Sequence, residues 1–460
     1  MEPARPSAVR EHRLAPWFAV AAVCLGAFMG QLDASIVTLA FPALQHDFGI
    51  GLGAAQWVSL AYLLVLVALL VPVGRWSDRA GRKLVYLYGF AVFTAASAGC
   101  GLAPTLWSLV ILRVVQAFGA AMLQANSVAL VATSVSPGRR RAALGIQAGA
   151  QAIGLALGPT LGGVVVSSLG WRWIFGINVP VGIVAIAAGW LLLPRTRDRG
   201  AATDLDRWGI MLLAAASTAL LVALSSAAGL PLPATAIGGL AVIAVATTVL
   251  LIRWERRAPR PLLDPAVLAS AGVGVGLGGA LLAYLVLFGP LVLFPQVDDH
   301  AGVLATGLVL TALPAGFGLA AVAADRVLPA TWSDRRRCLT GAFLATVAGA
   351  LLTVPVPPAG TAVLLGVLGL GLGVYIPANN ASIMSAVSAR TAATVGGMLN
   401  MARSLGTAGG VTVVTVTLHV AASTGGGTHA RTAAAMTALA CAAILMGVAA
   451  WRSEPARALD

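Results

Sequence analysis

The stretch "GRWSDRAGRK", Gly74 to Lys83, places five charged side chains between two long apolar runs. The whole chain of 460 residues is 59% hydrophobic and only 10% charged, whereas soluble domains are about 45–50% apolar and about 25% charged. We therefore interpret the stretch as a loop at a membrane surface. The apolar runs on either side of it are then membrane-spanning segments.

Outward from this loop, charges and clusters of Pro and Gly divide the chain into fourteen apolar runs. A helix needs about 20 apolar residues to span a bilayer, and continuous rather than alternating runs argue against a membrane barrel. The sequence therefore predicts an all-α polytopic membrane protein with fourteen transmembrane helices. The expected ranges are 15–40, 54–74, 84–103, 105–133, 142–168, 174–193, 208–228, 234–252, 269–294, 303–323, 338–355, 361–387, 393–420 and 430–451.

The positive charges indicate how these helices are oriented. Of the 29 Lys and Arg residues, 25 fall in loops on the side of the termini, two on the opposite side, and Arg113 and Arg403 within spans. Because Lys and Arg accumulate in cytoplasmic loops, both termini are expected in the cytoplasm. The net charge of +13 then reflects membrane topology, and no nucleic-acid partner is predicted.

Two charge-rich stretches, Pro194 to Trp208 and Arg253 to Pro265, interrupt the series of spans. They predict a six-helix bundle over 1–193, a linker with two additional transmembrane helices over 194–260, and a second six-helix bundle over 261–460. The two bundles are expected to be pseudo-symmetric, because three glycines recur at an offset of 252 residues, and such repeats are typical of transporters. These are Gly145, Gly154 and Gly158, matched by Gly397, Gly406 and Gly410.

Five motifs carry a resemblance to one family. The opening stretch is similar to the loop signature of the major facilitator superfamily, and "LRVVQAFGAA", Leu112 to Ala121, to its Arg-x-x-Gln motif. "GLALGPTLGG", Gly154 to Gly163, resembles the antiporter motif of drug exporters. "LDASIVTLAFP", Leu32 to Pro42, and "WRWIFGINVP", Trp171 to Pro180, resemble the fourteen-helix drug:proton antiporters of this superfamily.

The resemblance implies that the opening stretch is a cytoplasmic gate. Its acid and basic residues would pair across helix ends and hold one conformation closed from the cytoplasm. The alternative is that these charges only anchor the loop at the membrane surface. The gate candidates are Gly74, Asp78, Arg79, Gly81, Arg82 and Lys83.

Asp33 is the candidate for proton coupling. It is the one acid among sixteen Asp and Glu residues that lies well inside an expected span, nine residues before the Pro42 that closes it. A carboxylate at a helix centre costs about 2.5–3.5 kcal/mol, so it requires a partner or a function. Arg113 is the expected partner. The pair is either a site that binds and releases a proton or a permanent structural ion pair.

Further polar residues within the spans are candidates for lining a substrate cavity, although hydrogen bonds between packed helices explain several of them equally well. They are Gln31, Gln116, Gln124, Gln147, Gln151, Tyr375, Asn379, Asn400 and Arg403. The antiporter-like motif supplies a second set of candidates, and its stripe of Gly154, Gly158 and Gly162 is expected to let another helix approach closely. This set is Gly154, Gly158, Pro159, Gly162 and Gly163.

These features together predict a proton-coupled antiporter that exports small hydrophobic or amphipathic compounds by alternating access. The alternative is a dedicated exporter of one metabolite; the antiporter-like motif argues against uptake. No nucleophile–base pair, metal cluster or phosphate-binding loop points to an enzyme, and no cofactor other than the proton is expected. The expected partners are a small-molecule substrate, protons and lipid. The protein is expected to be a monomer. A bacterial cytoplasmic membrane is the expected location, because the composition suggests a GC-rich bacterial genome.

Overall fold

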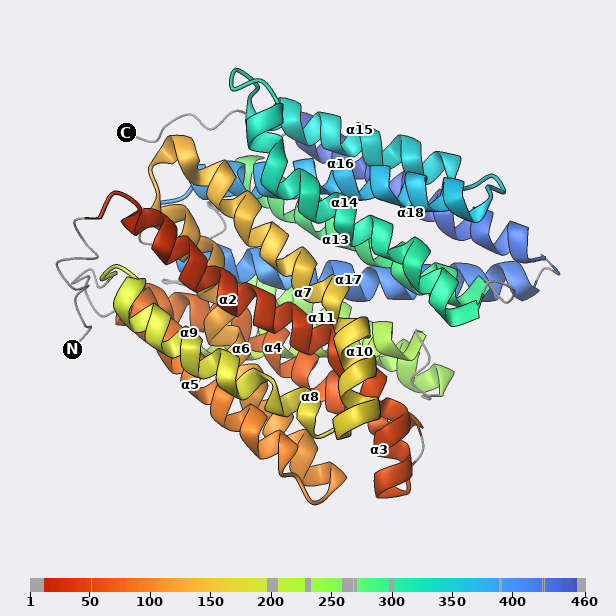
Figure 1. The fold of residues 1–460 in the computed structure, drawn as a ribbon, viewed down its shortest axis with the longest axis horizontal. Coiled ribbons are helices and arrows are strands. Elements are labelled where there is room, and N and C mark those ends of the chain that lie inside the picture. Colours follow the sequence, from red (N-terminus) through yellow and green to blue (C-terminus); the bar gives the residue numbers. More distant parts are fainter. Residues whose placement is uncertain are drawn as a thin grey trace.

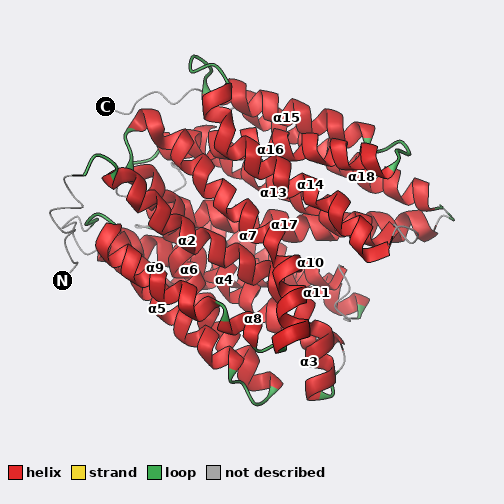
Figure 2. Ribbon diagram, in the orientation of Figure 1, coloured by secondary structure: helices red, strands yellow, loops and turns green. Residues whose placement is uncertain are grey.

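A computed structural model of the protein describes residues 12–50, 52–196, 206–227, 233–258, 268, 271–297, 302–388, 391–423, 425 and 427–452. Fourteen long helices dominate these residues, and loops join them (Figures 1 and 2). Parts of both linker stretches, at 197–205 and 259–267, lie outside the described residues.

The long helices follow the fourteen expected ranges in order. The first six are α2 (Ala15–Ile36), α4 (Leu52–Ala80), α5 (Arg82–Gly101), α6 (Leu106–Ser134), α7 (Arg140–Leu169) and α9 (Asn178–Leu192). The next two are α10 (Arg207–Ala227) and α11 (Ala234–Glu255). The last six are α13 (Ala271–Val297), α14 (Gly302–Val327), α15 (Asp334–Leu351), α16 (Pro358–Ser385), α17 (Ala392–Ser423) and α18 (Thr428–Arg452).

Not every one of these helices meets the requirements of a span on its own. Within the described residues, eleven are long and apolar enough to cross a membrane, or up to twelve if the bent pair Pro137–Gly158 and Leu161–Leu169 is one span. The described apolar part of α10 is the shorter Arg207–Ala223. α15 has 18 residues and begins with one aspartate and three arginines, which shortens its apolar part. The chain is thus an all-α polytopic membrane protein.

Two expected spans end differently from their prediction. The run 15–40 does not stop at Pro42, because η1 (Val37–Ala40) continues it and Pro42 lies in the first turn of the next helix, α3 (Phe41–Phe48). Asp33 therefore lies in the last turn of α2. The run 174–193 is divided into a short α8 (Trp173–Gly176) and α9.

Local sequence explains where two of the tight connections form. Gly81 has φ 101°, a conformation that favours glycine, and it alone separates α4 from α5. Thr105 begins α6 with a capping box, in which its hydroxyl accepts from the backbone N–H of Ser108 and the Ser108 hydroxyl accepts in return. Successive long helices run in opposite directions (Figure 1). We call the end at which α4 ends and α5 begins the basic end.

In the first half, glycines of α7 allow it to cross two other helices closely. A Cβ atom added at Gly154 would lie 2.5 Å from the carbonyl oxygen of Phe28 in α2, and one at Gly158 would meet Ser35 in α2. A Cβ at Gly145 would meet the carbonyl oxygen of Ala321 in α14. α7 therefore packs against α2 of its own half and against α14 of the other half, as small residues permit in membranes.

The second half repeats this arrangement with α17. A Cβ at Gly410 would lie 2.6 Å from the carbonyl oxygen of Leu285 in α13, and one at Gly406 would meet Leu281 in the same helix. A Cβ at Gly397 would meet the carbonyl oxygen of Leu70 in α4. The three glycine pairs found at an offset of 252 residues thus occupy equivalent crossings, which explains why glycine recurs there.

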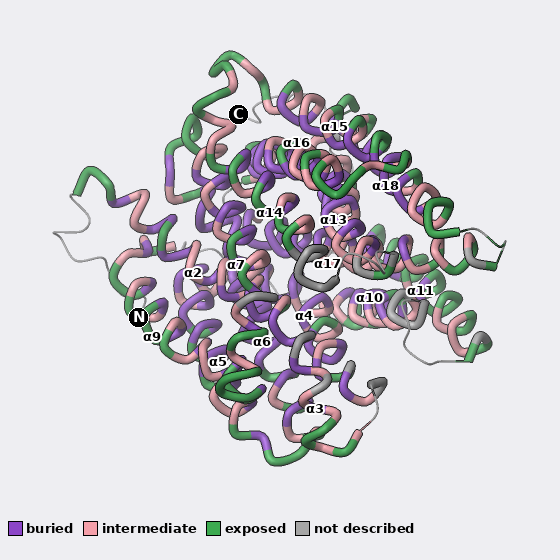
Figure 3. Tube along the Cα trace, turned by 45° about the vertical axis from the view of Figure 1, so that its right-hand side comes forward, coloured by how far each residue is buried: buried purple, intermediate pink, exposed green. Residues whose placement is uncertain are grey.

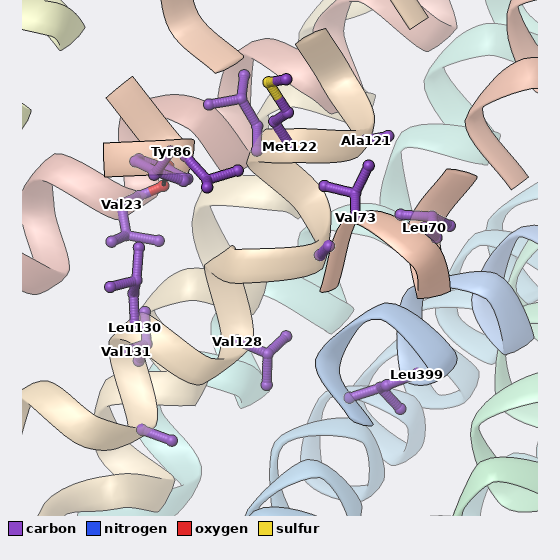
Figure 4. Close-up of a cluster of buried hydrophobic side chains, with 14 of the residues drawn as sticks. Val23, Leu70, Val73, Tyr86, Ala121, Met122, Val128, Leu130, Val131 and Leu399 are labelled. Atoms are coloured by element: carbon purple, nitrogen blue, oxygen red, sulfur yellow. Dashed lines mark hydrogen bonds between the residues drawn. The ribbon is translucent and has the colours of Figure 1, made fainter. Parts of the chain in front are cut away.

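The buried core follows from these crossings. Purple segments in Figure 3 mark buried residues along the facing sides of the helices. One apolar cluster lies mainly in the first half but includes Leu399 of α17. Figure 4 draws this side chain together with Leu70 of α4 and Val128 of α6. A second cluster belongs to the second half but includes Ala148 and Ala152 of α7. The core of the first half therefore includes residues of α13, α16 and α17, and the core of the second half includes residues of α7.

The two inserted helices pack at the side of this core. α10 and α11 pack on each other, and α10 also contacts α4 and α17. Only 11% of the apolar window of α11 is buried. Large apolar side chains such as Val242, Val245 and Leu250 are exposed on it, as is normal for a helix that faces lipid.

The crossing glycines generate a stability prediction. Gly410→Ala is expected to lower the thermal unfolding midpoint of the purified protein in detergent, because the added methyl group meets backbone that cannot rotate away. Overpacking of this kind costs about 1–3 kcal/mol. Gly163→Ala is the matched control, since nothing lies within 4 Å of its Cβ position and it gains the same helix propensity. Equal midpoints for the two variants would contradict the crossing.

Candidate functional site

The carboxylate of Asp33 is completely buried and fully hydrogen-bonded. Its Oδ2 accepts a hydrogen bond of 2.8 Å from Nη1 of Arg113. Its Oδ1 accepts from the side-chain amides of Gln116 at 3.2 Å and of Asn178 at 3.1 Å. Three donors from α6 and α9 thus converge on the one acid of α2, which confirms the expected partner of Asp33.

The guanidinium of Arg113 is held from several sides. Its Nε donates to the carbonyl oxygen of Val58 at 3.1 Å, and Nη1 also donates to Oε1 of Gln116 at 2.6 Å. Its Cζ lies 4.1 Å from the ring centroid of Tyr62, within the range of a cation–π interaction. Because Arg113 is 1% exposed, this ion pair is shielded from solvent, and removal of either partner leaves a buried charge.

Three residues of this network were not predicted. Ser97 of α5 accepts from Nε2 of Gln116 at 2.6 Å, Asn178 bonds Asp33, and Tyr62 covers Arg113. Asn178 is the one amide in the quoted motif "WRWIFGINVP", so its position in an apolar run was a usable signal. Ser97 and Tyr62 had no such signal, because serine and tyrosine are common in membrane helices without any partner across the bundle.

A cavity of about 320 Å³ lies between the two halves next to this network. Arg113 lines the cavity, whereas Asp33 is not among the lining residues. The guanidinium therefore stands between the carboxylate and the cavity. Other lining residues are Gly30, Gln31, Gln124 and Leu155 of the first half, Leu221 of α10, and Tyr284, Phe288, Asn400, Arg403 and Ser404 of the second half.

Four of the nine cavity candidates line this space: Gln31, Gln124, Asn400 and Arg403. Asn400 also joins the halves, because its Nδ2 donates to the carbonyl oxygen of Gln124 at 2.7 Å. Its Oδ1 accepts from Nη1 of Arg403 at 3.1 Å. α6 and α17 therefore meet at the wall of the cavity.

The other candidates have different positions. Gln116 belongs to the Asp33 network. Gln151 of α7 accepts from the hydroxyl of Tyr284 at 3.5 Å. Gln147 is buried, and among the described residues its Nε2 has no hydrogen-bond partner. The polar face of α7 thus lies behind the cavity wall, where the helix crosses the other half.

Tyr375 and Asn379 are not among the residues that line the cavity. The alternative of hydrogen bonds between packed helices describes both of them. The hydroxyl of Tyr375 donates to the carbonyl oxygen of Met446 at 3.4 Å. Nδ2 of Asn379 donates to the carbonyl oxygen of Gly276 at 2.9 Å. The polar face of α16 is turned toward α13 and α18, where the two side chains hold the helices together.

The predicted gate centres on Asp78, at the basic end. Its Oδ1 accepts from Nη2 of Arg82 at 2.9 Å and from the backbone N–H of Ala393 at 3.0 Å. Its Oδ2 accepts from the backbone N–H and the hydroxyl of Thr394, each at 2.8 Å. The carboxylate of α4 thus caps the N-terminus of α17, where a negative charge is favourable. This contact joins the two halves.

Other gate candidates support this contact or lie apart from it. A Cβ at Gly74 would lie 2.5 Å from the carbonyl oxygen of Ala393, so glycine lets α4 approach α17. Gly81 forms the turn, and Arg79 lies in the last turn of α4. Lys83 does not face the other half: its ammonium donates to the carbonyl oxygens of Trp190 and Leu193, each at 2.8 Å. It caps the end of α9 within its own half.

A second set of charges joins the halves at the basic end. Arg141 of α7 lies 3.3 Å from Asp325 of α14 and 3.1 Å from Asp334 of α15. Arg337 also contacts Asp325 at 3.3 Å. The two sets follow the same pattern. In each, an acid near the end of one helix binds an arginine at the start of the next helix, and the same acid also contacts the start of a helix in the opposite half. Both sets of contacts therefore join the two halves at the basic end.

The antiporter-like motif is partly a packing surface. Gly154 and Gly158 form the crossing with α2 described above, and Gly162 is buried. Gly163, which lies outside the predicted glycine stripe, faces open space. The side chain of Pro159 lies outside the described residues.

Comparisons with known proteins agree with this architecture. Residues 23–411 match the family model of the Major Facilitator Superfamily. The chain belongs to this superfamily. It is therefore a relative of membrane transporters rather than of enzymes.

Curated relatives cover most of the chain. The riboflavin transporter RibZ of Clostridioides difficile is 30% identical over 85% of this chain and 87% of its own. The methylenomycin A resistance protein of Streptomyces coelicolor is 31% identical over 94% of this chain and 91% of its own. The puromycin resistance protein pur8 of Streptomyces alboniger is 32% identical over 86% and 81%.

Among solved structures, the crystal structure of the human organic anion transporter MFSD10 has a TM-score of 0.66 at 18% identity. The match covers 95% of this chain and 99% of the other. At this identity the likeness concerns the fold alone, and it supports the arrangement of helices described above.

The capping contact of Asp78 generates a prediction. Asp78→Ala is expected to increase the separation of the two halves at the basic end, because loss of an N-cap costs about 0.5–2 kcal/mol and shifts the conformational equilibrium. The measurement is the distance between spin labels at Gly138→Cys and Ala330→Cys, two exposed loop positions of opposite halves, without the four native cysteines.

Asp47→Ala is the control for this experiment. Asp47 bonds Nε1 of Trp171 at 2.9 Å and Nη1 of Arg172 at 2.8 Å, all within the first half. These hydrogen bonds lower the pKa of Asp47 from its ordinary value, yet none of them crosses to the second half. An unchanged distance distribution in Asp78→Ala, or an equal change in both variants, would show that the capping contact of Asp78 does not hold the two halves together.

Proposed function

We propose that this superfamily member is a proton-coupled antiporter that exports small hydrophobic or amphipathic compounds. The observation that supports it most directly is the position of the Asp33–Arg113 pair. A buried acid in a membrane helix is expensive, and here its partner lines the cavity. A proton that binds Asp33 removes the charge that holds Arg113, so the state of the acid is communicated to the substrate site through one side chain.

The direction of transport follows from competition between two states. A proton from outside neutralises Asp33 and loosens Arg113, which favours release of the cargo. On the cytoplasmic side, cargo in the cavity favours the ionised pair and loss of the proton. Alternating access then carries each in turn past the midplane. The capping contact of Asp78 and the ion pairs of Arg141 would close the cytoplasmic side during the outward-open phase.

The proposal includes a topology with fourteen spans. α10 and α15 would cross the bilayer although they are short, because the alternation of helix direction and the distribution of positive charges both require them. The basic end and both termini would face the cytoplasm of a bacterial cell. The units would be the bundle 1–193, the linker with two helices 194–260 and the bundle 261–460, acting as a monomer.

Relatives favour export but leave the breadth of substrates open. Resistance proteins for methylenomycin A and puromycin are about 30% identical to this chain, which supports drug or antibiotic export. The same names, and that of the riboflavin transporter, support the alternative of a dedicated exporter of one metabolite. A transport assay over chemically unrelated compounds distinguishes the two, because a dedicated exporter carries one of them.

The coupling proposal is tested by Asp33→Asn. We expect this variant to lose proton-driven efflux from proteoliposomes with an imposed pH gradient, because an amide cannot bind and release the proton. Protein yield and downhill exchange of cargo measure whether the variant is intact. Efflux driven by the gradient at the normal rate would exclude Asp33 as the coupling site.

A double variant separates coupling from folding. Removal of one partner of a buried ion pair costs about 3–5 kcal/mol, since it leaves the other charge uncompensated. Asp33→Asn with Arg113→Gln removes both charges, so we expect it to be more stable than either single variant and still uncoupled. Restored coupling in the double variant would show that the pair has only a structural role.

A further inference from the structure

We propose that the cavity selects organic anions, and that an aromatic compound with a carboxylate or similar acidic group is its preferred cargo. The acidic group would bind Arg403. This inference rests on the proposed function, because it assigns a substrate class to the same cavity. It narrows the expectation of hydrophobic or amphipathic compounds to those with a negative charge.

Arg403 is a buried cation without an acidic partner. It is 5% exposed and lines the cavity from α17. Its Nη1 donates to Asn400, while its Nε has no hydrogen-bond partner among the described residues. No ion pair joins it to an acid of the described chain. An isolated charge in such a place is costly unless it is paired, so the arrangement favours an anion, which the described residues do not supply.

The contrast with Arg113 makes this specific. Both arginines line the cavity, and they are the two charged residues that do so among the described residues. The charge of Arg113 is balanced by Asp33. The charge of Arg403 is not balanced, so the site as a whole has one net positive charge. While Asp33 is ionised, a cationic compound would be repelled, whereas an anion would restore neutrality. Because protonation of Asp33 adds a positive charge to the site, release of an anion would have to come from the rearrangement of the helices that follows and not from the charge itself.

The surroundings of Arg403 indicate what kind of anion fits. The rings of Tyr284 and Phe288 are stacked with centroids 6.3 Å apart and an interplanar angle of 19°. The guanidinium Cζ lies 5.4 Å from the centroid of Tyr284. Aromatic ligands pack against such faces, and an arginine fork binds a carboxylate in a bidentate manner. One small molecule can therefore place its ring on Phe288 and its acidic group on Arg403.

The size and the polarity of the cavity agree with this cargo. A volume of about 320 Å³ is at the lower end of the range of ligand sites, about 300–1,000 Å³. Hydroxyl and amide side chains such as Ser404 and Gln124 complete the lining, and they accept or donate hydrogen bonds without adding charge. The export of an anion is also favoured by a membrane potential that is negative inside.

The test measures binding to the purified protein in detergent, without a proton gradient. The probes are naphthalene, coumarin and anthraquinone, each as the carboxylic acid, the primary amide and the aminomethyl compound. The readouts are the dissociation constant from calorimetry and the shift of the thermal unfolding midpoint. For at least one framework, we expect the acid to bind ten times or more tightly than the amide, and the aminomethyl compound to bind most weakly.

Variants of Arg403 identify the cause of this preference. Arg403→Gln is expected to reduce the preference for acid over amide to less than threefold, with amide binding unchanged. Arg403→Lys keeps the charge and should retain most of the preference. Because Arg403 has no acidic partner among the described residues, the Gln variant is expected to leave no opposite charge unpaired in the core, and its unfolding midpoint without ligand should not fall.

Three results would overturn the inference: no acid binds the wild type, the aminomethyl compound binds as tightly as the acid, or Arg403→Gln keeps the preference for the acid. These outcomes are separate from the failure of coupling. Selective binding of acids by a protein that shows no proton-driven flux would refute the antiporter proposal and leave the anion site standing. Proton-driven flux with no preference for acids would do the reverse.

Discussion

The buried ion pair between Asp33 and Arg113 is the constraint on which the rest of the structure depends. A carboxylate completely removed from water requires donors on both oxygens, and two other helices provide them. α2 supplies the acid, α6 supplies Arg113 and Gln116, and α9 supplies Asn178. The stack of Tyr62 on the guanidinium adds α4. The first half is therefore organised around one charge pair at the wall of the cavity.

In the proposed transport cycle, the crossings would transmit a change at this pair to the rest of the molecule. α2 is packed against α7 through Gly154 and Gly158, and α7 in turn crosses α14 of the other half. α17 makes the equivalent crossing from the second half to α4. Because backbone meets backbone at these points, the helices move as bodies and do not absorb a shift through side-chain rotation. Such a movement would have to break the hydrogen bonds between Asp78 and the start of α17.

Much of this arrangement was predictable from sequence, for identifiable physical reasons. The cost of charge in a bilayer singled out Asp33 and its partner. Hydropathy placed the fourteen helices, and the glycine repeat located the crossings, because only glycine permits such close backbone contact. The gate motif led to Asp78 and Arg82.

The predictions that differ from the structure have a common cause. Hydropathy identifies a helix, but it does not show which neighbouring helix each face of it contacts. For Tyr375 and Asn379 the sequence left cavity lining and helix packing open, and only the fold shows that their face of α16 packs inside the second half. Lys83 looked like a gate residue but caps the carbonyl oxygens of α9. Ser97 escaped notice because a hydroxyl often bonds its own helix, and only the fold shows that it supports Gln116.

The protonation state of Asp33 itself tests the central claim most directly. Infrared difference spectra of the protein in lipid, with ¹³C-labelled aspartate, detect the C=O stretch of a protonated carboxyl, and subtraction of the Asp33→Asn spectrum assigns it. The account predicts that this band appears for Asp33 as the pH falls through the range in which transport operates. A carboxylate that stays ionised over the whole of that range would contradict the account and identify the pair as a permanent structural contact.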